Sequence, residues 1–595
     1  MMVDGLDGLP ANPLAALDSI ENPTPENPGL FSGLDPDTRQ ALEGEVEWTR
    51  LDGGAVLFRE GDAADSVYVL YTGRLRVYVR APSGDDALVA EIGRGESVGE
   101  MALLTGAPRS ATVVAVRDSV LVRFSRSAFD RIVEHSPRLV LRVTRHLVER
   151  LQRTTHAPRA NATLTTVALI PLDPAIDASQ LGNSLLAAIG SAGSATLVTR
   201  DRAAAQHGSG AWLDALEREY RYVLYAGDGR DHAWTDRAVR QADCVLLVAP
   251  GDRPPDAGAV AAAVRHMPAQ AVRDLMLVHP PPHAAPRGTA RWLDATGARA
   301  HYHVRAGADA DIARVARMLT GRGIGLALGG GGARGFAHIG VIEALNEAGV
   351  PIDAIAGTSM GAVLAAQYAA GASPADMRDI NRRHWVRQNP LKDKTLPVVA
   401  LLAGRRLERM ISEMFGDTQI EDLWTPFFCV SADLTQAEMR VHSRGPLGLA
   451  VRASMSLPGL AIPVQESGNM LVDGGLMNNV PSDLLRARCG KVVAVDVSPE
   501  KDLAIAAPYP AAASGWRLLW GRKKSHLPGI GAILMRAALL SSKRHQTATA
   551  RDVDLFLHPR VEGFGMFEWA ALAALAEAGR ACAREALASS AVPLT

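Results

Sequence analysis

The sequence has few of the features that mark secreted, metal-binding or membrane-spanning proteins. Its four cysteines are far apart and show no paired spacing: Cys244, Cys429, Cys489 and Cys582. This spacing favours a reducing compartment over a disulfide framework or a zinc site. No apolar run approaches the ~20 residues of a membrane helix, and the N-terminus has no signal-peptide pattern. We therefore expect a cytoplasmic location, with peripheral membrane association as the open alternative.

The chain also lacks an excess of charge of either sign. Its 63 Lys and Arg residues and 64 Asp and Glu residues leave a formal net charge of −1, so no global field would attract nucleic acid. Aromatic residues make up only 5 %, but hydrophobic residues reach 47 %, which is typical of a globular chain rather than a disordered one. At 595 residues the chain needs more than one hydrophobic core. We predict three or four domains, no nucleic-acid partner, and an oligomeric state that the sequence leaves open.

Changes of pattern along the chain predict five segments. Residues 1–30 are rich in Pro, Asn, Asp and Gly and predict a mobile tail. Residues 31–155 contain short β-type runs between Gly and Asp turns, followed by a helical pattern, and predict a small antiparallel barrel or sandwich. Residues 156–320 alternate strand-like and helical runs, which predicts a parallel α/β domain whose role the sequence does not reveal. A second α/β domain is predicted over 321–500, and a C-terminal extension over 501–595 completes it.

Two glycine-dense turns open the second α/β domain. Each leads from an apolar strand into a helical pattern, which suits either a phosphate-binding loop or a nucleophile elbow. The first turn contains Gly330-x-Gly332-x-x-Gly335, and Asp353 follows about twenty residues later, as in a dinucleotide fold. However, the ribose-binding acid should end the second strand, whereas Asp353 precedes it. NAD binding is therefore the weaker interpretation.

The second turn, Gly357-x-Ser359-x-Gly361, supplies a candidate nucleophile. Flanking glycines remove side chains that would clash at a sharp turn, and the start of a helix favours negative charge on the Ser359 oxygen. Taken alone, Ser359 could equally be a helix cap. The upstream glycine run lacks side chains, so its backbone N–H groups can face a developing oxyanion. The predicted donors are Gly330, Gly331 and Gly332.

Asp473 is the candidate general base, in the turn Asp473-Gly474-Gly475 at the end of an apolar strand. A carboxylate with a reference pKa of ~3.9 is a weak base in water, so it would need a dry pocket. A triad would use a histidine instead, but none of the downstream histidines lies in a distinctive turn. These are His526, His545 and His558. We favour a Ser–Asp dyad.

In this order, the motifs resemble those of the patatin-like phospholipases. Gly330–Gly335 matches the family's G-x-G-x-x-G motif, Gly357–Gly361 its G-x-S-x-G elbow, and Asp473–Gly475 its D-G-A/G motif. The stretch RASMSLPGLAIPV at 452–464 is similar to another family segment, and the resemblance covers roughly 322–500.

The resemblance implies an acyl-ester hydrolase with a patatin-like α/β fold, Ser359 as nucleophile and Asp473 as base. The implied substrate is a phospholipid or lysophospholipid, and no cofactor or metal is required. Arg334 and His338 also match family positions, and we interpret both as structural.

A second motif lies at residues 93–115, GRGESVGEMALLTGAPRSATVVA. A short helix beginning near Glu100 would direct free N–H groups at an anion, and Arg109 could clamp it. The stretch is similar to the phosphate-binding cassette of cyclic nucleotide-binding domains, and residues 56–78 resemble their β-roll. The residues that fit the binding pattern are Gly99, Glu100, Arg109, Ser110 and Ala111. The implied regulator is cAMP or cGMP; the alternative is a barrel kept for docking or membrane contact.

The domain order resembles neuropathy target esterase and its bacterial relatives, which implies lysophospholipase or phospholipase B-type activity. Two other classes remain open: a cyclic nucleotide-responsive binding protein with a vestigial hydrolase domain, and a nucleotide-sensing transcription regulator. Intact Ser359, Asp473 and glycine loop favour the enzyme. Peripheral membrane contact is expected at residues 515–524, GWRLLWGRKK, unless this stretch packs on the hydrolase domain.

Overall fold

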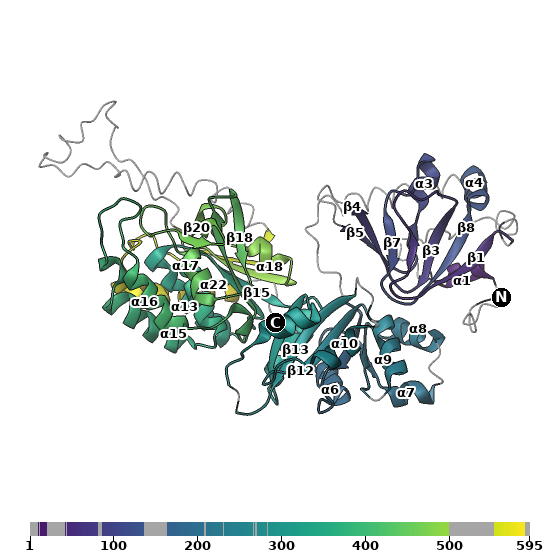
Figure 1. Cartoon of the computed structure of the whole chain (residues 1–595), viewed down its shortest axis with the longest axis horizontal. Coiled ribbons are helices and arrows are strands. Elements are labelled where there is room, and N and C mark those ends of the chain that lie inside the picture. Colours follow the sequence, from purple (N-terminus) through teal and green to yellow (C-terminus); the bar gives the residue numbers. More distant parts are fainter. Residues whose placement is uncertain are drawn as a thin grey trace, which may run out of the picture. The chain divides into compact units, whose positions relative to one another are not determined.

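The computed structural model divides into two compact units, Met1–Pro281 with Arg291–Thr320, and Pro282–Ala290 with Gly321–Thr595 (Figure 1). The structure describes residues 10, 12–20, 42, 44–80, 86–135, 164–206, 210–229, 231–265, 267, 271–282, 284–498 and 552–589. The predicted membrane-contact stretch 515–524, His526 and His545 lie outside the described residues. Part of the predicted tail is helical: α1, Pro13–Ile20, buries Leu14 and Leu17, because apolar residues at helical spacing follow a proline at the first helical position.

The N-terminal part of the first unit is a β-roll of two antiparallel sheets, ordered β1-β8-β3-β6 and β2-β7-β4-β5. The β3–β4 turn requires Gly73, where φ is +100° and a Cβ would lie 2.2 Å from Ser119 Oγ. The antiparallel barrel predicted from the turn spacing is confirmed. The elements are β1 Val46–Leu51, β2 Val56–Phe58, β3 Ser66–Thr72, β4 Leu75–Arg80, β5 Asp86–Ile92, β6 Ser97–Val98, α3 Glu100–Thr105, β7 Thr112–Ala115, β8 Ser119–Ser125 and α4 Arg126–His135.

The rest of the first unit is a six-stranded parallel sheet, ordered β10-β11-β9-β12-β13-β14. Both faces are covered: α6 and α12 bury one face, and residues from α7 to α11 bury the other. This explains the nearly continuous apolar strands, since a parallel sheet is covered on both sides. The elements are β9 Thr166–Pro171, α6 Ala178–Ile189, β10 Ala195–Val198, α7 Arg200–Ala205, α8 Gly210–Glu219, β11 Tyr222–Ala226, α9 His232–Gln241, β12 Cys244–Pro250, α10 Ala257–Arg265, β13 Val272–His279, α11 Thr289–Thr296, β14 Ala300–Arg305 and α12 Asp309–Leu319.

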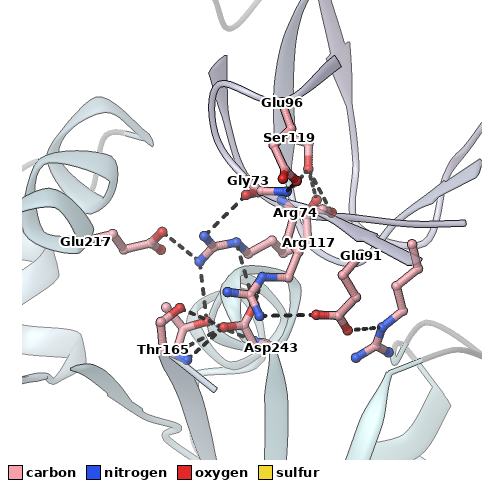
Figure 2. A network of polar contacts seen from close by, with 12 residues as sticks. Gly73, Arg74, Glu91, Glu96, Arg117, Ser119, Thr165, Glu217 and Asp243 are labelled. Atoms are coloured by element: carbon pink, nitrogen blue, oxygen red, sulfur yellow. Dashed lines mark hydrogen bonds and ion pairs between the residues drawn. The ribbon is translucent and has the colours of Figure 1, made fainter. Parts of the chain in front are cut away.

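Charged side chains join the β-roll to this parallel sheet (Figure 2). The Asp243 carboxylate, 1 % exposed, lies 3.4 Å from Arg74 Nε and 3.9 Å from Arg117 Nε, both on the β-roll. Its other oxygen accepts hydrogen bonds from Thr165 N–H and Oγ1–H, at 3.0 and 2.8 Å. Arg117 also pairs with Glu217 of α8 at 2.6 Å. Burial alone would raise the pKa of Asp243, but Arg117, Arg74 and the Thr165 hydrogen bonds outweigh it and lower that pKa.

The second unit is built on a mixed sheet, ordered β19-β20-β17-β16-β15-β21-β22, with β18 also paired to β17. Strands β15, β16 and β17 run parallel, whereas β20 runs antiparallel to β17. The fold class predicted from the sequence, a β-roll, a middle α/β segment and a C-terminal α/β domain, is confirmed. The strands are β15 Ile324–Leu328, β16 Ala354–Gly357, β17 Phe427–Asp433, β18 Glu438–His442, β19 Val464–Glu466, β20 Asn469–Asp473, β21 Lys491–Val495 and β22 Leu555–Leu557.

The helices of the second unit pack closely through small residues. A Cβ on Gly340 would lie 1.7 Å from Ala576 O, and one on Gly579 would lie 1.9 Å from Ala337 O, so α13 and α22 cross at nearly backbone contact. Among the residues that the structure describes, no helix is long and apolar enough to cross a membrane. The main helices are α13 Ala337–Glu347, α14 Met360–Ala369, α15 Pro374–Asn381, α16 Arg405–Phe415, α17 Leu447–Ser454, α18 Ser482–Arg486 and α22 Leu572–Ser589.

Candidate active site

Strand register brings the candidate nucleophile and base to the same level of the sheet. Gly357, the last residue of β16, pairs with Cys429 of β17, and Ser431, two residues farther along β17, pairs with Asp473 of β20. Ser359 lies two residues beyond Gly357, so it reaches the height of Asp473. Residues that are 114 positions apart in the chain are therefore brought together by the pairing of β16, β17 and β20.

The backbone at Ser359 has the sharp geometry of a nucleophile elbow. Ser359 has φ 55° and ψ −123°, a conformation that non-glycine residues adopt rarely and at a cost of about 1–3 kcal/mol. Both flanking glycines are required by close approach: a Cβ on Gly357 would lie 2.4 Å from Gly361 O, and one on Gly361 would lie 2.2 Å from Leu328 O. Packing of the turn against β15 therefore imposes the strain at Ser359.

The side chain of Ser359 does not act as a helix cap. Ser359 occupies the N-cap position of α14, but its hydroxyl makes no capping hydrogen bond to the first turn. Ser359 is partly exposed as a residue. Of the two interpretations that the sequence left open, this geometry favours the nucleophile.

The glycine loop follows β15, the strand next to β16, and lies against the elbow. A Cβ on Gly330 would lie 2.8 Å from Asn479 Oδ1 and 3.0 Å from Ser359 Cβ, so a side chain here would force its neighbours to shift. The N–H of Gly330 is directed elsewhere, to Asn479 O at 3.3 Å. Gly331 and Gly332 are partly exposed and donate to no protein acceptor in the described part of the chain. Of the three predicted oxyanion donors, Gly331 and Gly332 therefore have the freer N–H groups.

A buried histidine holds the start of this loop. His338 is fully buried on α13, and its Nε2 lies 2.7 Å from Gly329 O. Burial lowers the pKa of His338 to about 4, so the ring is neutral, and because a carbonyl can only accept, Nε2 carries the proton. Arg334 donates from Nε to Phe564 O at 2.8 Å. These contacts agree with the structural roles predicted for Arg334 and His338.

Asp473 lies in the dry environment that a carboxylate base requires. Its side chain is 1 % exposed, and one oxygen accepts from Gly475 N–H at 2.8 Å. The other oxygen, Oδ2, has no hydrogen bond of good geometry within the described residues, although the Ser359 hydroxyl is near enough to lower the pKa of Asp473. Burial has the larger effect and raises that pKa to about 6. Gly474 is required here, since a Cβ would lie 2.3 Å from Val430 O.

Two serines that the sequence analysis did not identify position this pair. Ser359 N–H donates to Ser454 Oγ at 3.0 Å, and Asp473 N–H donates to Ser456 O at 2.9 Å. Both serines belong to the stretch 452–464, whose similarity to a segment of the patatin-like phospholipases assigned no role to either serine. The available signal was the pair of serines two residues apart: Ser454 ends α17, Ser456 lies just beyond it, and both are buried.

The histidine of a triad is not found among these contacts. His558 faces Asp496 and Glu562, at 3.9 and 3.8 Å. His442 of β18 bonds to Ser431 Oγ at 2.8 Å, and burial lowers its pKa to about 4. Within the described residues, these histidines therefore have other partners than Ser359.

In the β-roll, the residues of the nucleotide-binding pattern gather around Arg109. Its guanidinium donates to Ser66 O at 2.8 Å and to Gly99 O at 3.0 Å, and it stacks over the Phe58 ring at 4.1 Å. Arg109, Glu100 and Ala111 are buried, whereas Ser110 is exposed. Burial lowers the pKa of Arg109, but the guanidinium stays charged at any ordinary pH.

Comparison with protein families assigns a description to three parts of the chain. Residues 326–486 match the patatin-like phospholipases, and residues 48–136 match the cyclic nucleotide-binding domain. Residues 163–320 match the P-loop like domain of the neuropathy target esterase family. In this chain, the turn between β9 and α6, LDPAID, lacks the glycines and the lysine of a phosphate-binding P-loop, so we assign it no nucleotide.

Curated relatives align with most of the chain. It is 33 % identical to human "patatin-like phospholipase domain-containing protein 6", over 89 % of this chain and 44 % of that protein. It is 30 % identical to "lysophospholipase nte1" of Aspergillus fumigatus, over 91 % of this chain and 42 % of that protein. It is 30 % identical to "neuropathy target esterase sws" of Drosophila melanogaster, over 91 % of this chain and 43 % of that protein. The chain thus spans less than half the length of these relatives.

Proposed function

We propose that this chain, whose residues 326–486 match the patatin-like phospholipases, is a serine hydrolase that cleaves the acyl esters of lysophospholipids and phospholipids. One observation carries the proposal. Ser359 has a strained backbone and makes no capping hydrogen bond, and it reaches the level of buried Asp473 in the sheet. Within the described part of the chain, Oδ2 of Asp473 has no well-formed hydrogen bond. The name of the fungal relative, a lysophospholipase, supports the substrate class, and the name of the fly relative, an esterase, supports the type of bond cleaved.

The first step of the proposed mechanism is a proton transfer. Asp473 Oδ2 accepts the proton of the Ser359 hydroxyl while Oγ attacks the ester carbonyl carbon. The carbonyl oxygen becomes negative and faces the N–H groups of Gly331 and Gly332; losing one such donor typically costs about 10²–10³ in turnover. Because these donors are backbone groups fixed by packing, they need no rearrangement during the reaction.

The second half of the cycle reverses the proton transfer. The tetrahedral intermediate collapses, the bond to the leaving alkoxide breaks, and the protonated Asp473 gives that oxygen its proton. Ser359 is left acylated. Water then attacks the acyl-enzyme, with Asp473 accepting the water proton, and the fatty acid leaves as Ser359 regains its hydrogen. No atom beyond the enzyme, the ester and water is needed.

Hydrolysis of two esters tests the proposal. Lysophosphatidylcholine and a short-chain nitrophenyl ester would be offered to the wild type, Ser359→Ala and Asp473→Asn. We expect the wild type to cleave both esters and each variant to lose nearly all activity. Equal rates in all three proteins would contradict the proposal and favour a binding protein with a vestigial hydrolase domain.

We propose further that the cyclic nucleotide-binding domain, present at residues 48–136, binds cAMP or cGMP. The clustering of Gly99, Glu100 and Arg109 supports this, because the Arg109 guanidinium can pair with a cyclic phosphate. Calorimetry with either nucleotide tests it. Arg109→Ala should abolish binding, whereas Arg109→Lys should weaken it, since lysine keeps the charge but loses the bidentate geometry. If the wild type gives no binding heat with either nucleotide, the proposal is contradicted, and the alternative of a barrel kept for docking or membrane contact is favoured.

A further inference from the structure

A short apolar loop of the second unit is exposed. Leu396, Val398, Val399 and Leu401 have 79, 82, 65 and 51 % of their surface exposed. With Pro397 they fall within six consecutive residues, 396–401, which we call the apolar loop. Single exposed apolar side chains are ordinary, but a cluster of them usually marks a contact surface.

Backbone hydrogen bonds fix the base of the apolar loop. Thr395 N–H donates to Leu401 O at 3.0 Å, which closes the loop on itself. Leu401 N–H donates to Gly459 O at 2.9 Å, and Leu402 N–H donates to Leu460 O at 3.0 Å. The loop therefore projects from a fixed base, while Leu402 beneath it is buried.

The stretch that anchors the apolar loop also contacts the candidate catalytic residues. Ser454 Oγ accepts from Ser359 N–H, and Ser456 O accepts from Asp473 N–H. Gly459, three residues beyond Ser456, accepts from the loop. Residues 454–460 thus tie the exposed apolar side chains to the nucleophile and the base within one unit.

Basic side chains flank the apolar loop on both sides. The acidic residues between 392 and 409 are Asp393 and Glu408, so positive charge is in excess. The helix α16 that follows turns Leu407 and Met410 inward and leaves its arginines in solvent. The exposed basic residues are Lys392, Lys394, Arg405, Arg406 and Arg409.

We propose that the apolar loop inserts into the surface of an anionic lipid membrane and docks the second unit there. Apolar side chains beside Lys and Arg suit the boundary between acyl chains and anionic headgroups. A protein partner is less well matched, because a stable interface buries about 800 Å² per partner, more than a six-residue projection offers. The choice of lipid as the occupant rests on the proposed function.

Vesicle flotation of the full chain tests the docking. All proteins carry Ser359→Ala, so that hydrolysis cannot change the vesicles. They are mixed with vesicles of phosphatidylcholine alone or of phosphatidylcholine with phosphatidylserine. The test variant is Leu396→Ser/Val398→Ser/Val399→Ser, and the matched control is Leu434→Ser/Met470→Ser, which removes two other exposed apolar side chains. A charge variant, Arg405→Gln/Arg406→Gln, separates insertion of the apolar side chains from electrostatic attraction to the anionic lipid.

We expect the parent to float with the anionic vesicles, the control to match it, and the loop variant to bind at least about tenfold more weakly. The charge variant should lose the preference for phosphatidylserine. Unchanged flotation of the loop variant would overturn the proposal. So would gel filtration in which the parent is dimeric and the loop variant monomeric, because a second copy would then cover the loop.

A soluble substrate separates this proposal from the proposed function. With Ser359 restored, the loop variant should cleave the short-chain nitrophenyl ester at the wild-type rate but cleave lysophosphatidylcholine in anionic vesicles more slowly. If the wild type cleaves the soluble ester but does not float, the docking is wrong and the hydrolase stands. If Ser359→Ala floats but the wild type cleaves neither ester, the hydrolase is wrong and the docking stands.

Discussion

Asp243 in the first unit and Asp473 in the second are each 1 % exposed, yet burial has opposite results for them. Asp243 pairs with Arg117 and Arg74 and accepts hydrogen bonds from Thr165, and these contacts outweigh burial and lower its pKa (Figure 2). Asp473 has one backbone N–H and the Ser359 hydroxyl, and burial raises its pKa to about 6. Burial alone does not identify a functional carboxylate; the supply of compensating charge decides whether it holds domains together or accepts protons.

Replacing each of the two aspartates by asparagine should separate catalysis from the contact between the β-roll and the parallel sheet. Asp473→Asn keeps the shape and the acceptor for Gly475 N–H but removes the base, so kcat/KM for a nitrophenyl ester should fall by at least about 10⁴-fold. Asp243→Asn should leave kcat/KM within about threefold of the wild type, because it touches no reacting atom. Steady-state kinetics of the two variants provide the measurement. Comparable losses in both would contradict the distinction between the two aspartates.

For the free energy of unfolding, Asp243→Asn should have the larger effect and Asp473→Asn the smaller one. Arg74, Arg117 and Asp243 form the contact between the β-roll and the parallel sheet, which we call the joint. Asp243→Asn removes the buried carboxylate that both arginines share, while Glu91 and Glu217 still pair with them, so the unfolding free energy of the first unit should fall by about 2 kcal/mol. Denaturant unfolding of the full chain would measure this fall. Asp201→Asn is the control, because Asp201 pairs with Arg200 at an exposed position, where solvent screening leaves an ion pair little effect on stability. Equal midpoints for Asp243→Asn and Asp201→Asn would show that the joint does not depend on Asp243.

The pH dependence of catalysis should report Asp473. The base must be ionised, and its pKa is raised to about 6, so kcat/KM should fall about tenfold per pH unit below 6 and level off above it. Initial rates on the nitrophenyl ester between pH 4 and pH 8, a range of roughly two units on either side, would reveal this limb. Rates that stay nearly constant down to pH 4 would place the pKa near the ordinary value of 3.8 and would mean that water reaches the Asp473 carboxylate.

The pH dependence of stability should differ in sign between the two units. The raised pKa of Asp473 favours the folded state below pH 3.8, and this contribution is lost as the pH rises through about 6. The lowered pKa of Asp243 stabilises above pH 3.8, and its contribution is lost as the pH falls through the lowered value.

Asp473→Asn should therefore raise the stability of the second unit at pH 7 by about 1 kcal/mol, the smallest of these effects. Thermal unfolding at pH 4 and pH 7 would measure it, with Asp243→Asn expected to be destabilised at pH 7. A variant Asp473→Asn less stable than the wild type at pH 7 would mean that the ionised carboxylate is well compensated.

Much of the candidate site could be predicted because glycine leaves a local signature. Gly357, Gly361 and Gly474 lie where a Cβ would meet backbone atoms, and each belongs to a motif visible in the sequence. Partners distant in sequence left no such trace. Ser454 and Ser456 act through a hydroxyl and a carbonyl that only the folded segment directs, and the N–H of Gly330 is occupied by Asn479, far away in the chain.

The joint and the apolar loop were not predicted for a related reason. Arg117 and Asp243 lie 126 positions apart, in segments whose patterns describe separate domains, so neither hydropathy nor spacing indicates that they meet. The loop sequence LPVVAL has the composition of a buried strand. Only the hydrogen bonds at its base, which leave Leu396, Val398 and Val399 exposed, distinguish it from a core segment.

Every group given a chemical role in ester cleavage belongs to one sheet of the second unit and the turns that leave it. Ser359 follows β16, the glycine loop follows β15 and Asp473 ends β20. The chemistry is therefore modular in an evolutionary sense. The upstream unit can be lost or exchanged without rebuilding the reaction centre, and selection on that unit is free to act separately from selection on turnover.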